Sequence, residues 1–144
     1  MQSRIIKAET QHCAELASRL DKAASDFIQN YWQIDPKAGL LKSLSDSILC
    51  WSILLDGKVA GMFGCTREGN VWLTTAPDIN NKTAIRFIRQ SQGYIKRMQE
   101  ECGELFCYAH KDNIKLINWL LWSGFEITGE IGDFKSCVLH LQQG

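Results

Sequence analysis

Three consecutive apolar segments in the middle of the chain constrain the fold more than any other feature. Residues 48–55 (ILCWSILL), 58–67 (KVAGMFGCTR) and 71–76 (VWLTTA) are joined by the short turn sequences DG and EGN. Asp-Gly is favoured in two-residue hairpin turns, whose central residues take positive φ. The sequence therefore predicts three consecutive antiparallel strands. Because the first segment is apolar at almost every position, we expect both faces of the sheet to be covered.

Helical patterns flank these strands on both sides along the chain. The spacing predicts a strand at 4–9 and helices at 10–20, 21–32 and 37–44 before them, and a helix at 82–101, a strand at 104–109, a helix at 113–123 and strands at 125–130 and 134–141 after them. We expect Thr10 to cap the first helix and Asn80 or Asn81 to cap the long one. This order predicts an α+β fold in a single domain, residues 1–144, with a twisted mixed central sheet flanked by helices on both faces.

Composition excludes several classes of function. The 144 residues carry 16 basic and 16 acidic side chains, so no global positive field attracts nucleic acid or an anionic membrane. The apolar runs are too short to span a bilayer. Six cysteines form no C-x-x-C pair, and we expect free thiols, no bound metal and a cytoplasmic protein: Cys13, Cys50, Cys65, Cys102, Cys107 and Cys137.

The order of elements and the segment 107–125 (CYAHKDNIKLINWLLWSGF) together resemble the GNAT family of acetyl-CoA-dependent N-acetyltransferases. Asn113, Ile117, Gly124 and Phe125 match, in register, the family pattern for the last helix and its end. The resemblance implies a GNAT-like fold and transfer of an acetyl group from acetyl-CoA to an amine. A closer resemblance is to the internal virion protein A family of short-tailed phages, which would place the protein in the host cytoplasm or the virion.

The resemblance also implies where acetyl-CoA would bind. The backbone edge of the fourth strand, here Thr74, Thr75 and Ala76, would pair with the pantetheine arm. Lys82 and Thr83, in the first turn of the next helix, would contact the pyrophosphate, and Asn113 would contact the cofactor beyond the strand.

Two positions depart from the family pattern. The pyrophosphate loop reads APDINNKTA, without the family's glycines and with Asp78 near the expected phosphate. Leu120 stands where the family has a tyrosine that protonates the leaving thiolate, and a leucine donates no proton. Tyr108 and His110 are the substitute catalytic candidates, although a histidine at this position is more often a structural residue at a strand end. Cys107, between aromatic neighbours, is interpreted as a core residue.

The helix at 114–122 is apolar almost all round, so it is either buried or covers a partner. Trp119 and Trp122 cannot both share the face of Ile117, and a protein partner through these tryptophans is an alternative to core packing. Two functions stay open. The chain is either a GNAT-type N-acyltransferase with an unidentified amine acceptor, or a catalytically degenerate GNAT-fold binding protein, such as a phage internal virion or host-interaction protein.

Overall fold

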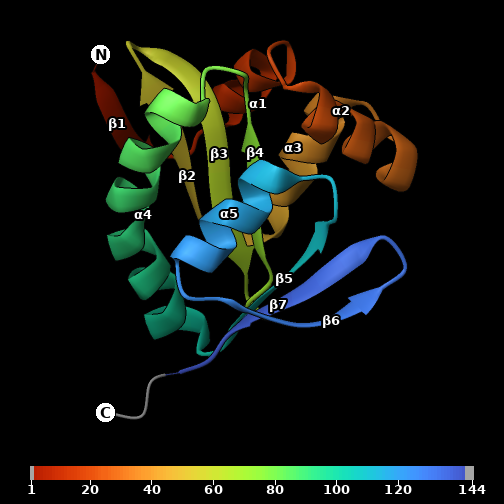
Figure 1. Ribbon diagram of the computed structural model, residues 1–144. Coiled ribbons are helices and arrows are strands. Elements are labelled where there is room, and N and C mark those ends of the chain that lie inside the picture. Colours follow the sequence, from red (N-terminus) through yellow and green to blue (C-terminus); the bar gives the residue numbers. More distant parts are fainter. Residues whose placement is uncertain (1, 142–144) are drawn as a thin grey trace.

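The computed structural model describes residues 2–141, so residue 1 and residues 142–144 of the expected domain lie outside the described residues. Along the chain the elements are β1 (Ser3–Lys7), α1 (Thr10–Ala17), α2 (Lys22–Phe27), the π-helical turn η1 (Ile28–Trp32), α3 (Pro36–Asp46), β2 (Ser47–Leu55), β3 (Lys58–Thr66), β4 (Val71–Thr75), α4 (Asn81–Cys102), β5 (Leu105–His110), α5 (Ile114–Trp122), β6 (Glu126–Ile131) and β7 (Phe134–Leu139) (Figure 1).

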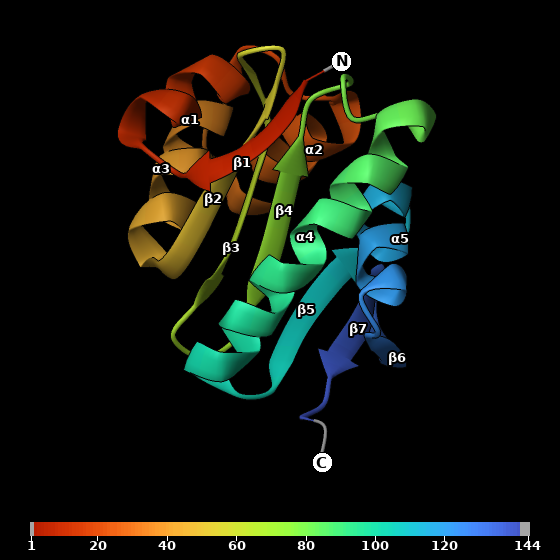
Figure 2. The same ribbon diagram turned by 90° about the vertical axis from the view of Figure 1, so that its left-hand side faces the viewer.

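The strands form two antiparallel groups that meet at one point. The order is β1-β2-β3-β4 in the first and β5-β7-β6 in the second. A parallel bridge between Asn70 and Phe106 joins them where β4 and β5 begin. Beyond this bridge the two strands diverge, as Figure 2 shows. The α+β fold with a mixed sheet, predicted from the sequence, is confirmed.

The three-strand meander is confirmed with its turn chemistry. Asp56 and Gly57 have φ of 49° and 81°, so both central residues of the hairpin turn are left-handed, as Asp-Gly predicts. β3 then pairs with β2 on one side and β4 on the other. Its residues are buried over nearly the whole length, because helices cover both faces of the sheet.

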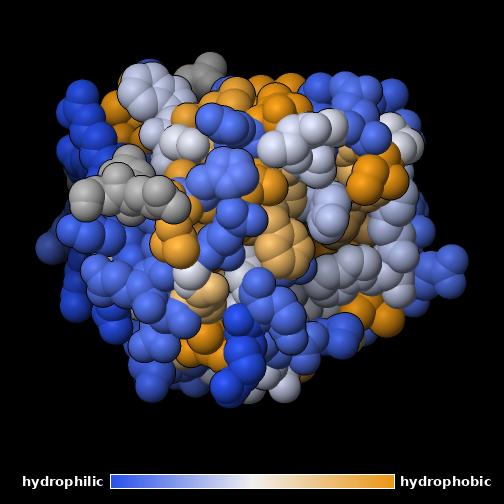
Figure 3. All heavy atoms as spheres, turned by 90° about the horizontal axis from the view of Figure 1, so that it is seen from below, coloured by the Kyte–Doolittle hydropathy of each residue, from blue (hydrophilic) through white to orange (hydrophobic). Residues whose placement is uncertain are grey.

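Helices pack on each face around two clusters of buried side chains. α4 and α5 cover one face, with Phe63, Phe87 and Trp119 in the larger cluster. α1 and α3 lie on the other face, where Leu16 and Met62 belong to the smaller cluster (Figures 1 and 2). None of the described helices combines the length and the apolar character needed to cross a membrane. Seen from below, the surface shows separate hydrophobic patches between hydrophilic side chains (Figure 3).

The helix ends correct several expectations. Thr10 is the first residue of α1, and Glu9 is the cap, because its N–H donates to His12 Nδ1 and its carbonyl accepts from His12 N–H, both at 3.0 Å. Asn80, the first of the two candidates, caps α4. The helix expected over 21–32 is α-helical only to Phe27 and continues as the π turn. On α4, Ile85 is 57% exposed, although its spacing from Ile88 and Ile95 predicts an inward-facing position.

Gly69 holds the junction of β4 and β5. Its φ is +95°, its carbonyl accepts from Phe106 N–H at 2.9 Å, and an added Cβ would lie 2.5 Å from the Glu104 carbonyl oxygen. We expect Gly69→Ala to lower the free energy of unfolding by about 1–2 kcal/mol, because alanine disfavours this φ and the backbone has no room to move. Urea denaturation measures this loss. The control is Gly132→Ala, which has positive φ without a neighbour within 4 Å, and should cost less.

Candidate functional site

The divergence of β4 and β5 opens a cleft with a cavity on each side. The α4–α5 cavity, of about 350 Å³, is lined by residues that include Leu73, Ile79, Ile88, Ile114, Trp119 and Trp122. The α2–α3 cavity, of about 230 Å³, is lined by residues that include Phe27, Trp32, Leu40, Trp72, Tyr108 and Phe134. Leu73 borders both cavities, so a ligand on one side of the cleft can meet a ligand on the other at β4.

Backbone groups along the outer edge of β4 differ in what they bind. The Thr75 carbonyl accepts from Asp21 N–H at 3.1 Å, whereas the Ala76 N–H donates to the Ala60 carbonyl at 2.8 Å. Backbone directions alternate along a strand, so Thr74, paired with Met62, faces β3, while Leu73 faces the cleft with Thr75. Of the predicted edge residues, Thr75 therefore has a backbone that faces the cleft, but its carbonyl is already hydrogen-bonded. The next residue whose backbone faces the cleft is Leu73.

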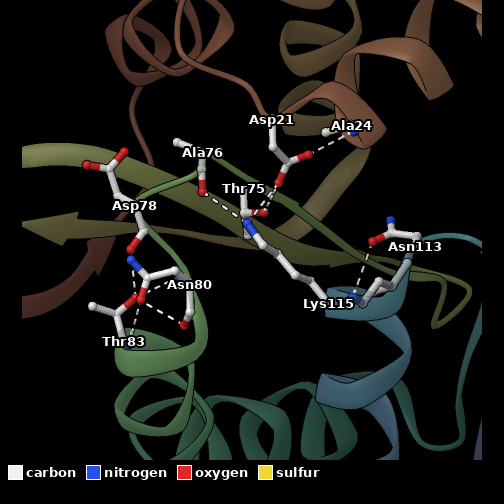
Figure 4. Close-up of polar contacts among 10 residues, drawn as sticks. Asp21, Ala24, Thr75, Ala76, Asp78, Asn80, Thr83, Asn113 and Lys115 are labelled. Atoms are coloured by element: carbon white, nitrogen blue, oxygen red, sulfur yellow. Dashed lines mark hydrogen bonds and ion pairs between the residues drawn. The ribbon is translucent and has the colours of Figure 1, made fainter.

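A polar clasp, formed by Asp21, Thr75 and Lys115, crosses the end of this cleft (Figure 4). The Asp21 carboxylate accepts from Thr75 Oγ1 at 2.8 Å and from Lys115 Nζ at 3.1 Å. The same ammonium lies 3.4 Å from the Ala76 carbonyl oxygen. The clasp thus ties the first turn of α5 to β4 and to the start of α2, across one end of the cleft.

Sequence reasoning missed the clasp. Asp21 also caps α2 by accepting from Ala24 N–H at 3.0 Å, a role that its position before a helical pattern could have predicted. Lys115 offered a second signal, because a cation in the first turn of a helix opposes the helix dipole and needs a compensating anion. The partner could not be found, since 94 residues separate the two.

The N-terminus of α4 is occupied by its own cap. Asn80 Oδ1 accepts from the N–H groups of Lys82 and Thr83, at 2.9 and 3.3 Å. Thr83 Oγ1 accepts from Asn80 N–H at 2.9 Å and donates to the Asp78 carbonyl at 2.6 Å. The amides and hydroxyl that the resemblance assigns to a pyrophosphate are therefore already hydrogen-bonded.

Charges near this N-terminus are more favourable to an anion than the sequence indicated. The Asp78 carboxylate is paired with Arg19 at 2.6 Å and is directed away from the α4 N-terminus (Figure 4). A shallow hollow of about 530 Å³ is lined by both Lys82 and Lys115, together with Asp21, Pro77 and Asn80. Both lysines and the N-terminal end of α4 border this hollow, and the Lys115 ammonium is paired there with the Asp21 carboxylate, so the charge that Lys82 adds makes the hollow favourable to an anion.

Tyr108, His110 and Asn113 all line the α2–α3 cavity. Tyr108 is 51% exposed. His110 Nδ1 accepts from Asp112 N–H at 3.2 Å, so a neutral ring carries its proton on Nε2. Asn113 caps α5 by accepting from Leu116 N–H at 3.3 Å. The structure thus gathers the predicted catalytic pair and Asn113 around one cavity, and places Lys82 and Thr83 at the N-terminus of α4.

The two other positions considered, Leu120 and Cys107, supply neither an acid nor a nucleophile at neutral pH. Leu120, at the family's tyrosine position, is fully buried in the core. Burial raises the pKa of the Cys107 thiol to about 12, so it is not a thiolate nucleophile at neutral pH. All six cysteines are free thiols. Within residues 2–141, no group of three His, Cys, Asp or Glu side chains is placed to hold a metal.

The two tryptophans of α5 differ sharply in exposure. Trp119 is 1% exposed and donates its Nε1–H to Ser91 Oγ at 2.9 Å, so it is a core residue. Trp122 is 73% exposed. The prediction of a protein partner through both residues is therefore restricted to Trp122, because no partner reaches the buried Trp119.

Neither a protein-family model nor a curated protein sequence matches this chain. Solved structures do match it over almost its whole length. The PaiA N-acetyltransferase of Thermoplasma acidophilum, in complex with coenzyme A, has a TM-score of 0.69 at 15% identity over 98% of this chain and 100% of its own. The aminoglycoside acetyltransferase AAC(6')-Ib, in complex with ribostamycin and coenzyme A, has a TM-score of 0.68 at 12% identity over 97% and 94%.

A GNAT-family acetyltransferase of Bacillus anthracis has a TM-score of 0.66 at 12% identity, over 96% of this chain and 93% of its own. Each likeness extends over almost the full length of both chains. At such identities the likeness concerns the fold, and this chain has the fold of the GNAT acetyltransferases.

Proposed function

We propose that the chain is an N-acetyltransferase that takes an acetyl group from acetyl-CoA and delivers it to an amine. The observation that carries this proposal is the divergence of β4 and β5, which leaves the backbone of Leu73 facing a cleft with a cavity on either side. A donor in the α4–α5 cavity and an acceptor in the α2–α3 cavity would meet there. The coenzyme A complexes of proteins with this fold support the choice of donor.

The residues fit the pantetheine arm of acetyl-CoA better than its phosphates. The N–H and C=O of Leu73 would pair with the amides of the pantetheine arm, as a neighbouring strand would. Lys82 and Lys115 would contact the phosphates. Asn80, however, competes with the phosphates for the amides of α4. Lys115 would also have to leave the Asp21 carboxylate and the Ala76 carbonyl. We therefore expect binding that is weak for an acetyltransferase.

Acetyl-CoA supplies a thioester whose carbonyl carbon the amine nitrogen attacks, so that a C–N bond forms and the C–S bond breaks. The departing thiolate needs a proton, and we assign this role to the hydroxyl of Tyr108, since Leu120 has none to give. His110 would take the proton of the amine at Nε2, for which the neutral ring must hold its own proton on Nδ1 instead of on Nε2. His110 Nδ1 then loses its bond from Asp112 N–H, but it lies 3.9 Å from the Asp112 carboxylate, which compensates the charge of the protonated ring.

Calorimetric titration with acetyl-CoA tests the donor. Binding should also raise thermal stability by an amount that grows with the logarithm of ligand concentration, about 2.7 kcal/mol at one hundred times Kd. Lys82→Glu should weaken the affinity about fivefold, because a phosphate contact becomes a repulsion. Lys96→Glu is the matched control. It reverses a charge on the same helix about 21 Å away and should leave Kd unchanged.

An absence of both heat and melting shift at millimolar acetyl-CoA would exclude the enzyme and favour the second candidate, a GNAT-fold binding protein without catalysis. The observations that favour it are the occupied amides of α4 and the buried Leu120. Trp122 would then be the first residue to mutate in a partner surface. The likeness to phage internal virion proteins stays a prediction.

A further inference from the structure

Aromatic rings line the α2–α3 cavity and an outer hollow next to it. The hollow, of about 220 Å³, shares Phe27, His110 and Asn113 with the cavity. Tyr31 and Phe134 stand 5.2 Å apart between ring centroids, and each packs against the His110 ring, at 5.6 and 5.4 Å. These rings come from the α2–η1 segment and from the β5–β7 pair, so the tertiary fold builds the wall.

The charges change from the outer hollow to the inner cavity. Asp26 and Asp112 line the outer hollow. Among the described residues that line the inner cavity, there is no Asp, Glu, Lys or Arg. Asp26 is already paired with Lys22 Nζ at 2.5 Å. An approaching ammonium group is therefore attracted mainly by the Asp112 carboxylate and by the partly exposed rings of Tyr31 and Trp32. Farther in, the apolar wall favours the neutral amine, which is the nucleophilic form.

The size of the inner cavity limits the ligand. A cavity of about 150 Å³ lined by apolar side chains holds benzene, so about 230 Å³ has room for one ring and a short arm. Any ammonium group of a polyamine or an aminoglycoside that enters the inner cavity in addition to the reacting amine would meet a wall without a carboxylate. Each unpaired charge would lose its hydration without gaining a partner.

The geometry points to an acceptor that is a primary monoamine with a single aromatic ring or a short branched aliphatic body, of the chemical class of phenethylamine. This inference rests on the proposed function, and it deepens that function by naming the acceptor class. The ring would lie against Phe27, Trp72 and Phe134, and the amine would point toward β4, Tyr108 and His110, where the acetyl group of the donor would arrive. The acceptor class therefore differs from that of the fold relative solved with ribostamycin.

Calorimetric titration with phenethylamine, without acetyl-CoA, tests the inference separately from the donor. We expect phenethylamine to bind at least tenfold more tightly than spermidine. Ala24→Phe, which places a ring inside the cavity, should weaken phenethylamine binding at least tenfold. Gln29→Phe adds the same ring to an exposed position outside the cavity and should change nothing. Ser43→Leu, on the opposite wall, provides a second filling variant if Ala24→Phe unfolds.

The outcomes separate the two proposals. If acetyl-CoA binds and phenethylamine does not, or if spermidine binds more tightly, the acceptor class is wrong and the proposed function stands. If phenethylamine binds and acetyl-CoA does not, the cavity is an amine site and the proposed function is wrong. Unchanged phenethylamine affinity in both filling variants would place the amine elsewhere and overturn the inference.

Discussion

Trp119→Ala is expected to lower the free energy of unfolding by about 3–5 kcal/mol. Trp119 is 1% exposed and fills the space between α4, α5 and β3, with its ring 5.7 Å from Phe63 and 5.8 Å from Phe87. Removing the indole loses the burial of a large apolar surface and enlarges the α4–α5 cavity. Ser91 Oγ also loses the indole N–H that it accepts, although it still donates to the Ile88 carbonyl at 3.0 Å.

Trp122→Ala provides the matched control, because it removes the same side chain three residues farther along the same helix. Trp122 is 73% exposed, so its loss should change stability by no more than about 0.5 kcal/mol. Urea denaturation followed by far-UV circular dichroism measures both variants. Equal losses for the two tryptophans, or a loss under about 1 kcal/mol for Trp119, would contradict the core assignment.

The contrast between these tryptophans illustrates what the sequence could predict. The helix at 114–122 is apolar on nearly every face, which left open whether one or both tryptophans would lie outside the core, and the pattern did not say which. The choice depends on what α5 packs against, and Phe63 and Phe87 lie on β3 and α4. Local signals fared better. The Asp-Gly pair predicted the β2–β3 turn, and the apolar strands predicted helices on both faces, because both depend on neighbours in sequence.

The site was predictable only where one segment determines it. The short polar segment 110–113 joins the end of β5 to the start of α5. Tyr108, His110 and Asn113 were therefore expected near one another from the sequence. The clasp between Asp21 and Lys115 depends on a contact across 94 residues. Similarly, the wall of the α2–α3 cavity brings Tyr31 against Phe134. No periodicity records such contacts, because each segment reads as an ordinary helix or strand by itself.

Asn80→Gly is expected to tighten acetyl-CoA binding by about 2 kcal/mol, roughly thirtyfold. Asn80 Oδ1 now holds the N–H groups of Lys82 and Thr83. Glycine frees both amides for a phosphate, and a hydrogen bond to a charged group contributes about 1.5–3 kcal/mol. The added freedom of the loop offsets about 0.5–1 kcal/mol of that gain. Folding should lose only a few tenths of a kcal/mol, since glycine is itself an acceptable cap.

Two further variants make the cause of this gain specific. Asp35→Gly removes the side-chain cap of α3, which accepts from Ala38 N–H at 3.1 Å, and should leave the affinity for acetyl-CoA unchanged. In the double variant Asn80→Gly with Lys82→Glu, the new repulsion should cancel much of the gain, because both changes act on the same phosphate. The affinity of Asn80→Gly should also fall as salt rises, since screening weakens charged contacts. Calorimetry in which Asn80→Gly binds no better than the original chain would show that the phosphates do not lie at α4, and would exclude the placement of the donor proposed for this cleft.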